Sequence, residues 1–275
     1  MAAKSVVITG GTKGLGMAYA TELLRRGHNV AICARSQSGV DAALAKLKPL
    51  AAQGAVVDGV VCDTTDPAAV RSLWDLAVGR FGRVDIWVNN AGYARTGASF
   101  LQTTPDDIDR MVRDNVIGTL FACDVAMAGL KRQGGGRIYL TLGGGSASGR
   151  VVANMTVYST TKRALKYFAT ALVEEAKESA PMVLIGTISP GVNMTEGMLR
   201  EIAAVPPEER AKVLKPLNFI GEHVETTAPW IVDRMLADTK QGSDITWLTT
   251  GRLMGRSLGM LFSRRDILSR YGLGV

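Results

Sequence analysis

The segment YSTTK places a phenol and an amine, Tyr158 and Lys162, four residues apart at the start of a strongly helical stretch. Residues at positions i and i+4 share one face of a helix, so the ammonium group can lie near the phenol. A nearby cation favours the ionised phenol, which brings a weak acid within reach of acid and base catalysis. The pair therefore predicts a proton-transfer site, and the alternative is an amphipathic surface pair.

A glycine-rich segment, VVITGGTKGLG, coincides with the end of the first apolar run. Glycine permits sharp turns and a close approach of backbone to ligand, while the following helix offers free N–H groups to an anion. Strand, glycine loop and helix together predict a pyrophosphate-binding turn, and the alternative is a purely structural turn. The residues expected to form this cofactor site are Gly10, Thr12, Lys13, Gly14, Leu15 and Gly16.

The second apolar run ends as NVAICARS, without the acidic residue that binds a ribose hydroxyl in NAD sites. Ala34 occupies that position, Arg35 follows it, and Lys13 lies in the glycine loop. Two cations at these positions could flank a 2′-phosphate, to which arginine donates paired hydrogen bonds. The pattern favours NADP(H) as cofactor, and the alternative is two ordinary solvated cations.

Short apolar runs alternate with helical patterns along the chain, which is typical of βαβ units. Their nearly continuous Val and Ile content predicts a sheet covered by helices on both faces. The fold class is therefore α/β, a Rossmann-type doubly wound fold with a mostly parallel seven-stranded sheet. Strands are expected in residues 5–10, 29–34, 55–62, 84–89, 137–142, 182–189 and 244–250. Helices are expected in residues 17–27, 39–53, 66–82, 104–133 and 157–179.

No linker or internal repeat interrupts the chain before about residue 190, so residues 1–275 are expected to form one domain. Residues 192–221 hold two helical patterns and should cover the strand ends, where open α/β sheets bind ligands. Their apolar stripe could mould around an apolar ligand or could simply be the packed side of two helices. The stripe consists of Met194, Met198, Leu199, Ile202, Val205, Leu214 and Leu217.

Residues 251–275 form a basic C-terminal extension in which arginines alternate with Leu, Met and Phe. This pattern predicts an interfacial helix, on a membrane surface or on protein. Docking on its own chain or on a neighbouring subunit is favoured because glycines interrupt a short apolar face.

The composition narrows the possible partners and locations of the protein. The chain has 275 residues, 47% of them hydrophobic, which suffices for a folded core. Its net charge of +7 is spread along the chain, so we expect no nucleic-acid partner. Cys33, Cys62 and Cys123 form no CxxC pair, and His28 and His223, expected at the surface, lack metal-ligand spacing. We expect no metal, no membrane span and a cytoplasmic location.

Six motifs together resemble the short-chain dehydrogenase/reductase family over residues 4–250. They are TGGTKGLG, the CD pair at 62–63, NNAG at 89–92, Asn115, YSTTK and PGVNMT, in the order and spacing of that family. The resemblance implies hydride transfer between NADPH and the carbonyl or alcohol group of a small molecule. It also implies a homodimer or homotetramer, built on the helices that carry Asn115 and Tyr158.

The resemblance implies a role for each catalytic residue. Tyr158 would be the general acid–base, Lys162 would bind the nicotinamide ribose and lower the Tyr158 pKa, and Asn115 would hold a water in a proton relay. A serine would bind the substrate oxygen, and Ser146, twelve residues before Tyr158, is favoured over Ser148. The alternative is that both serines are turn residues that bond their own backbone.

The resemblance also implies cofactor contacts outside the glycine loop. Asp63 could contact adenine or could only cap a strand end, and Thr195 could bind the carboxamide, cap a helix, or do both. The segment with Asn89 would line the cofactor and steady the central strand. The full set is Asp63, Asn89, Ala91, Gly92, Pro190, Gly191 and Thr195.

One departure from the family pattern affects the substrate site. The strand before Ser146 ends in LTLGGG, where family members commonly have a polar, Ser-rich sequence. This stretch, YSTTKRAL and the extended C-terminus resemble the chlorophyll b reductase branch, which suggests a bulky hydrophobic carbonyl substrate. The departure also leaves a second function open, a non-catalytic NADP(H)-binding regulator or scaffold.

Overall fold

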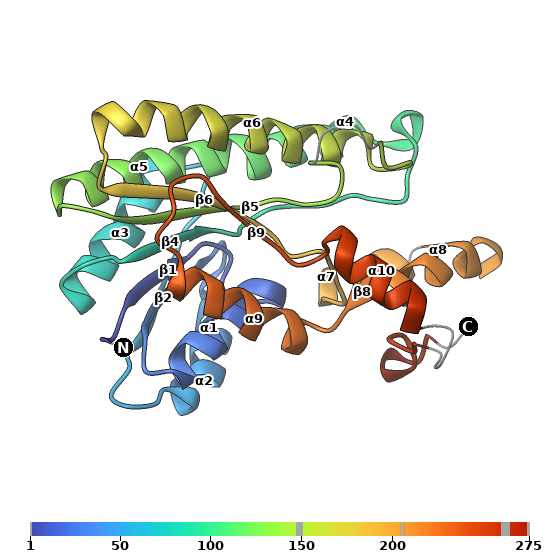
Figure 1. The fold of residues 1–275 in the computed structure, drawn as a ribbon, viewed down its shortest axis with the longest axis horizontal. Helices are drawn as coiled ribbons and strands as arrows, with labels where there is room; N and C mark the ends of the chain where they lie inside the picture. Colours follow the sequence, from blue (N-terminus) through green and yellow to red (C-terminus); the bar gives the residue numbers. More distant parts are fainter. Residues whose placement is uncertain (1, 147–150, 204, 206, 260–264, 274–275) are drawn as a thin grey trace.

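Seven parallel strands form the central sheet of the computed structural model, which describes residues 2–146, 151–203, 205, 207–259 and 265–273 (Figure 1). The strand order is β3-β2-β1-β4-β5-β6-β9, and every neighbouring pair is parallel. Each strand overlaps a predicted run, which confirms the Rossmann-type sheet. The strands are β1 (Ser5–Ile8), β2 (Asn29–Ala34), β3 (Val57–Val61), β4 (Ile86–Asn89), β5 (Gly136–Thr141), β6 (Val183–Ser189) and β9 (Ser243–Thr246).

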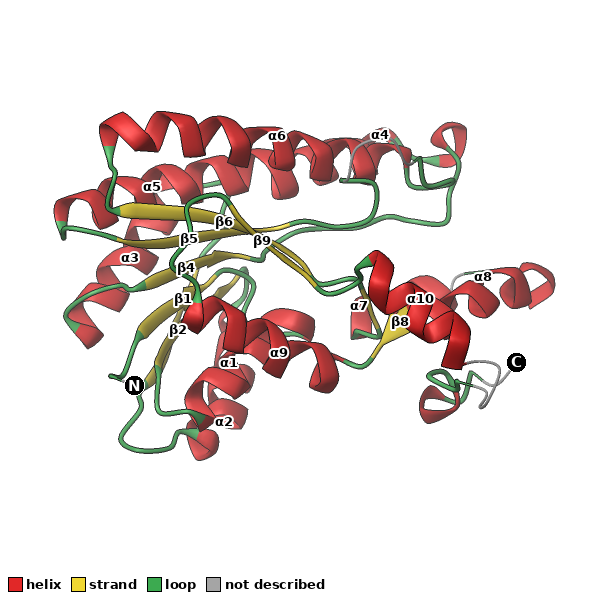
Figure 2. Ribbon diagram, viewed as in Figure 1, coloured by secondary structure: helices red, strands yellow, loops and turns green. Residues whose placement is uncertain are grey.

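Helices cover both faces of the sheet, as the apolar strands require (Figure 2). One face carries α1 (Gly14–Arg25), α2 (Gln37–Leu47) and α9 (Val224–Ala237), and the other carries α3 (Pro67–Phe81), α5 (Gly118–Arg132) and α6 (Thr156–Ser179). Buried side chains fill both interfaces, with Tyr19 and Ile231 on the first face. On the second face the rings of Trp74 and Trp87 stack with their centroids 6.0 Å apart.

The stretch predicted as one helix over residues 104–133 is interrupted. α4 (Pro105–Val112) leads into a π-helical turn, Arg113–Ile117, before α5 begins. Asn115 lies in this turn, and its fully buried side chain bonds to groups outside the helix. A π turn widens the helical repeat and is common at functional sites. Periodicity alone could not predict the turn because apolar spacing continues on both sides of it.

α9 and two short strands were not predicted from the sequence. α9 contains Pro229 and several β-branched residues, both of which weaken a helical pattern. The strands β7 (Val192–Asn193) and β8 (Gly221–Glu222) pair in parallel and are too short to show an alternating pattern.

A helical layer lies beyond the carboxyl ends of the sheet strands (Figure 1). We call residues 192–223 the cover, which contains α7 (Glu196–Ala203) and α8 (Pro207–Ile220), and residues 250–273 the tail, which begins with α10 (Thr250–Gly259). The predicted apolar stripe of the cover packs against the tail of the same chain, which favours the packing interpretation. This cluster contains Met194, Ile202, Leu214, Leu217, Ile267 and Leu268.

Buried polar groups fix the tail to the cover. The Glu222 carboxylate accepts from Arg256 at 2.7 Å and from Arg265 at 2.8 Å, and its side chain is only 10% exposed. Arg256 also donates to the carbonyls of Phe219 and Ile220 at the C-terminal end of α8. The Asn218 amide bonds two backbone groups of the tail. Cover and tail therefore form one packed layer.

The prediction that His28 lies at the surface is wrong. His28 is 5% exposed, and its Nδ1 accepts a hydrogen bond from the backbone N–H of Lys4 at 3.0 Å. Burial lowers the pKa of His28, and the charge of Arg26 lowers it further. His223 is partly buried and bonds to Tyr271 in the tail. Within the described residues, no helix is both long and apolar enough to cross a membrane.

Candidate active site

The glycine loop between β1 and α1 has the geometry of an anion cradle. Gly10 and Gly14 have φ angles of +64° and +53°, which side chains rarely tolerate. A Cβ on Gly16 would lie 2.4 Å from the Gly10 carbonyl oxygen, so only glycine fits there. Lys13 is the N-cap of α1 and makes no side-chain capping bond. The amides at the start of α1 are therefore available to a pyrophosphate.

Neighbouring strand ends hold this loop in place. The Thr9 hydroxyl accepts from the backbone N–H groups of Asn90 and Ala91, both at 3.0 Å. The Asn90 amide donates to the carbonyls of Thr9 and Gly10. Asn89 points the other way, into the core, where it bonds Trp87 and Cys123. Its side chain therefore steadies the strand, and Asn90, which sequence analysis did not single out, contacts the loop.

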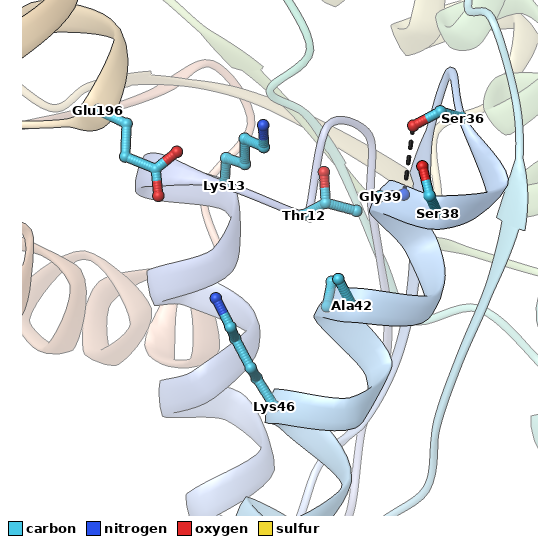
Figure 3. Close-up of a pocket in the computed structure, with 9 residues that line it drawn as sticks. Thr12, Lys13, Ser36, Ser38, Gly39, Ala42, Lys46 and Glu196 are labelled. Atoms are coloured by element: carbon cyan, nitrogen blue, oxygen red, sulfur yellow. Dashed lines mark hydrogen bonds between the residues drawn. The ribbon is translucent and has the colours of Figure 1, made fainter.

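A cavity of about 310 Å³ opens beside the glycine loop, between the first turns of α1 and α2 (Figure 3). Two lysines reach it, Lys13 from the loop and Lys46 from α2, together with the hydroxyl groups of Thr12, Ser36 and Ser38. Within the described residues neither lysine forms an ion pair. The Glu196 carboxylate also lines the cavity, but two lysines and three hydroxyl groups outnumber it, and such a donor-rich lining can bind a phosphate group.

The contact of Arg35 with a 2′-phosphate stays a prediction, because the structure holds Arg35 in an ion pair outside this cavity. Its guanidinium pairs with Asp114 at 3.2 Å, and Arg35 does not line the cavity. The carboxylate of Asp114 is 16% exposed and also pairs with Arg110, so it attracts cations strongly. Lys46 is the second cation at the cavity instead. Sequence spacing could not reveal it because it lies three turns along α2.

Asp63 follows β3 and acts as a cap in the turn that it begins. Its Oδ1 accepts from the backbone N–H of Thr65 at 2.9 Å and from the Thr65 hydroxyl at 2.8 Å. These bonds support the capping role that the sequence left open. They leave its other carboxylate oxygen for further contacts.

Tyr158 and Lys162 lie together on the first turns of α6. The Lys162 ammonium is 5.8 Å from the centre of the Tyr158 ring and donates to the Thr141 carbonyl at 3.0 Å. Burial lowers the pKa of Lys162 to about 8. Burial, and after it the Glu201 carboxylate, raise the pKa of Tyr158 to about 12. The expected lowering of the phenol pKa is therefore not seen, because desolvation outweighs the field of a lysine turned toward a carbonyl.

Asn115 joins this pair from the π turn. Its Oδ1 accepts from the Tyr93 backbone N–H at 2.7 Å, and its Nδ2 donates to Thr161 on α6 at 3.0 Å. A Cβ on Gly92 would lie 2.7 Å from Asn115 Oδ1 and 3.7 Å from Lys162 Nζ. Gly92 thus lets the amide and the ammonium approach one another. The structure brings Asn115, Tyr158 and Lys162 to one place, as predicted.

The glycines after β5 determine what touches the phenol. A Cβ on Gly143 would lie 2.2 Å from the Tyr158 hydroxyl oxygen, so the backbone of Gly143 packs directly against it. Ser146 is buried, and its backbone N–H donates to the Gly143 carbonyl at 3.2 Å. Ser148 lies outside the described residues. A side chain at position 143 would therefore collide with the phenol, which glycine avoids.

The start of the cover lies against the glycine loop. The Thr195 hydroxyl accepts from the backbone N–H of Met198 at 3.2 Å and so caps α7. A Cβ on Gly14 would lie 3.3 Å from the Thr195 methyl group. The Pro190 carbonyl accepts from Asn193, and Gly191 turns with a φ angle of +74°. Residues 190–195 thus lead from the end of β6 to the cofactor loop.

The chain belongs to the short-chain dehydrogenase family. The family model described as "short chain dehydrogenase" matches residues 4–204. The chain is 31% identical over 265 residues to "Probable chlorophyll(ide) b reductase NYC1, chloroplastic" of Arabidopsis thaliana, with 91% of this chain and 52% of that protein covered. The chain thus spans about half the length of that relative. It is also 31% identical to L-fucose dehydrogenase of Oryctolagus cuniculus, with 97% and 93% covered.

Solved structures agree with the fold. A short chain dehydrogenase from Burkholderia cenocepacia in complex with NADP has a TM-score of 0.72 and 27% identity, with 88% of this chain and 95% of that chain covered. NAD⁺-bound xylitol dehydrogenase has a TM-score of 0.75 and 24% identity, with 88% of this chain and 96% of that chain covered. These comparisons confirm the predicted family and show that the chain is an oxidoreductase. The similar solved structures include one complex with NADP and one with NAD⁺.

Proposed function

We propose that this oxidoreductase uses NADPH to reduce the carbonyl group of a hydrophobic small molecule, with Tyr158 as the general acid. The observation that carries the proposal is the buried meeting of Tyr158, Lys162 and Asn115 at the end of a sheet with an anion-binding glycine loop. Asn115 and Lys162 are buried polar groups held in fixed positions beside Tyr158, an arrangement that points to chemistry. A non-catalytic NADP(H)-binding role has less support because all three groups are in place.

Three groups of residues would bind the cofactor. The backbone of residues 10–16 and the first amides of α1 would hold the pyrophosphate. Lys13, Lys46 and Ser36 would hold a 2′-phosphate in the adjoining cavity. Thr195 and residues 190–191 would face the nicotinamide end. The nicotinamide supplies the hydride when the cofactor is bound, and the protein supplies orientation and a proton.

Proton transfer is the part that the protein must perform. Tyr158 would donate its hydroxyl proton to the substrate oxygen as that oxygen gains negative charge. With a pKa of about 12, Tyr158 holds its proton at neutral pH and is therefore in the form that can donate one. Lys162, held by the Thr141 carbonyl, would bind the ribose and favour reprotonation through Asn115. Ser146 would donate a second hydrogen bond to the substrate oxygen.

The domain organisation, oligomeric state, substrate class and location of the protein are also part of the proposal. Residues 1–275 would act as one domain, because the tail and cover pack on one another. A homodimer or homotetramer would form through α5 and α6, where Tyr167 is 78% exposed. The similarity to chlorophyll(ide) b reductase suggests a bulky hydrophobic carbonyl compound. That relative is named chloroplastic, whereas we propose a cytoplasmic location for this chain.

The proposal is tested by NADPH and NADH consumption with a panel of hydrophobic ketones and aldehydes. We expect turnover with NADPH, and a KM for NADPH that Lys13→Ala raises about tenfold or more, since one charge-assisted contact contributes about 1.5–3 kcal/mol. The KM for NADH should change little. Lys48→Ala, an exposed lysine one residue beyond α2, is the matched control. Equal effects on both cofactors would contradict the 2′-phosphate site, and cofactor binding without turnover would favour the regulatory alternative.

A further inference from the structure

A partly buried carboxylate, Glu201, lies in the cover on the side that faces the active site. Its Oε2 accepts a hydrogen bond from the hydroxyl of Thr96, in the loop after β4. Burial raises the pKa of Glu201. Among the described residues no cation lies within ion-pair distance of it, because Arg95 pairs with Asp107 and Arg200 donates to the Glu196 carbonyl. Glu201 is thus a desolvated acid without a structural counter-ion.

The loop that holds Glu201 is attached to the catalytic residues at two points. The backbone N–H of Gly97 donates to the carbonyl of Asn154 at 2.9 Å, four residues before Tyr158. At the start of the same loop, the Tyr93 backbone bonds both ends of the Asn115 amide. The loop that contacts the Glu201 carboxylate is therefore bonded both to the turn before α6 and to Asn115.

The charges around Tyr158 agree with this placement. After burial, the field of Glu201 raises the pKa of Tyr158, and no other charged group in the described part of the chain contributes. Arg95 and Arg200 act on Glu201 and lower its pKa, but burial outweighs them. A substrate whose carbonyl oxygen reaches Tyr158 would therefore bind within the field of the Glu201 carboxylate.

We propose that Glu201 is a specificity-determining residue, which excludes substrates with a carboxylate next to the reacting carbonyl and admits their neutral counterparts. The proposal rests on the proposed carbonyl reductase function and deepens it by naming the charge class of the substrate. Two like charges in a desolvated site repel far more strongly than in water. The free Glu201 oxygen can also accept a hydrogen bond from a hydroxyl or amide of a neutral substrate.

The test compares benzoylformate with its methyl ester, which have the same ketone and differ in charge. The ratio of kcat/KM for ester over acid is measured with saturating NADPH in the wild type, Glu201→Gln and Glu174→Gln. We expect Glu201→Gln to lower this ratio at least tenfold by gain of activity on the acid. Glu174→Gln, which removes an exposed carboxylate from the far end of α6, should leave the ratio unchanged.

A binding experiment separates this inference from the proposed function. The affinities of mandelate and methyl mandelate for the protein with NADP⁺ are measured by tryptophan fluorescence in the same variants and in Glu201→Asp. Glu201→Asp keeps the charge and should keep the preference for the ester. An unchanged preference in Glu201→Gln would overturn the role of Glu201. Absent turnover in the wild type would contradict the reductase function, while the binding preference would still decide on Glu201.

Discussion

The cofactor loop is held mainly by backbone groups, whereas the cover is held by side chains of the tail. Around the loop, Thr9 and Asn90 bond main-chain atoms, and glycines exclude any side chain. In the cover, one carboxylate, Glu222, and two tail arginines carry the polar contacts. Backbone geometry tolerates few sequence changes, while a layer of side-chain contacts can vary. The cofactor loop therefore depends on backbone geometry, and the cover depends on a few long-range side-chain contacts.

Among the variants that test this comparison, the largest expected effect on catalysis comes from Gly143, at the boundary between the two regions. A methyl group there would lie 2.2 Å from the Tyr158 hydroxyl oxygen and would push the phenol aside. We expect Gly143→Ala to lower kcat about 100-fold, because such displacements are that costly, with NADPH affinity retained.

Gly144→Ala is the matched control for that variant. Its added methyl would meet only the flexible side chain of Met155, at 3.0 Å, so kcat should stay near the wild-type value. Steady-state kinetics and NADPH fluorescence titration give both quantities. Equal losses in the two variants would show that the loop, rather than the contact with the phenol, controls activity.

The second effect tests the attachment of the cover. Glu222→Gln leaves two buried arginines without their carboxylate, which costs about 3 kcal/mol when a buried pair loses one partner. We expect amide hydrogen exchange in residues 192–223 to accelerate more than 100-fold, which is the rate change that corresponds to this loss of about 3 kcal/mol. Exchange in the sheet should stay slow. The KM for substrate should rise because α7 is no longer fixed.

Glu225→Gln provides the control for this experiment. Glu225 pairs with Arg270 at the surface, where both side chains are more than half exposed, and such pairs contribute about 0–1 kcal/mol. Its exchange pattern should match that of the wild type. Faster exchange throughout the sheet in Glu222→Gln would contradict a separately held cover.

The smallest expected effect is on stability and concerns His28, the residue before β2. Its folded-state pKa lies below the ordinary value of 6.5, so the neutral ring stabilises the fold above pH 6.5, and this contribution is lost as the pH falls below it. A protonated Nδ1 can no longer accept the Lys4 amide hydrogen. Thermal unfolding should show Tm falling between pH 7.5 and 5.5 by a few degrees more in the wild type than in His28→Gln. Parallel curves would contradict this assignment.

The sheet, the glycine loop and the pairing of Tyr158 with Lys162 could be predicted from sequence because their signals are local. Each strand is a short apolar run, and the glycines follow β1 directly. The pairing of Tyr158 with Lys162 follows from helical spacing. The NNAG motif pointed to Asn89, but its neighbour Asn90 contacts the loop. Side chains alternate along a strand, and the sequence does not show which of the two faces the loop.

The contacts of the cover could not be predicted because they join residues far apart in the sequence. Glu222 meets Arg265 across 43 residues, and Glu201 meets Thr96 across 105 residues. No local pattern predicts the ion pair between Arg35 and the partly buried Asp114, which lie far apart in the sequence. Contacts of this kind depend on how the elements pack, and no local pattern records them.

The central claim is that Tyr158 donates the proton while the glycine loop binds the cofactor independently. Single-turnover oxidation of bound NADPH, with methyl benzoylformate as substrate, tests it in the wild type, Tyr158→Phe and Tyr167→Phe, an exposed tyrosine on the same helix. We predict a loss of about 10²- to 10⁴-fold in rate for Tyr158→Phe alone, with the Kd for NADPH unchanged. A Tyr158→Phe variant that keeps the wild-type rate would contradict the account.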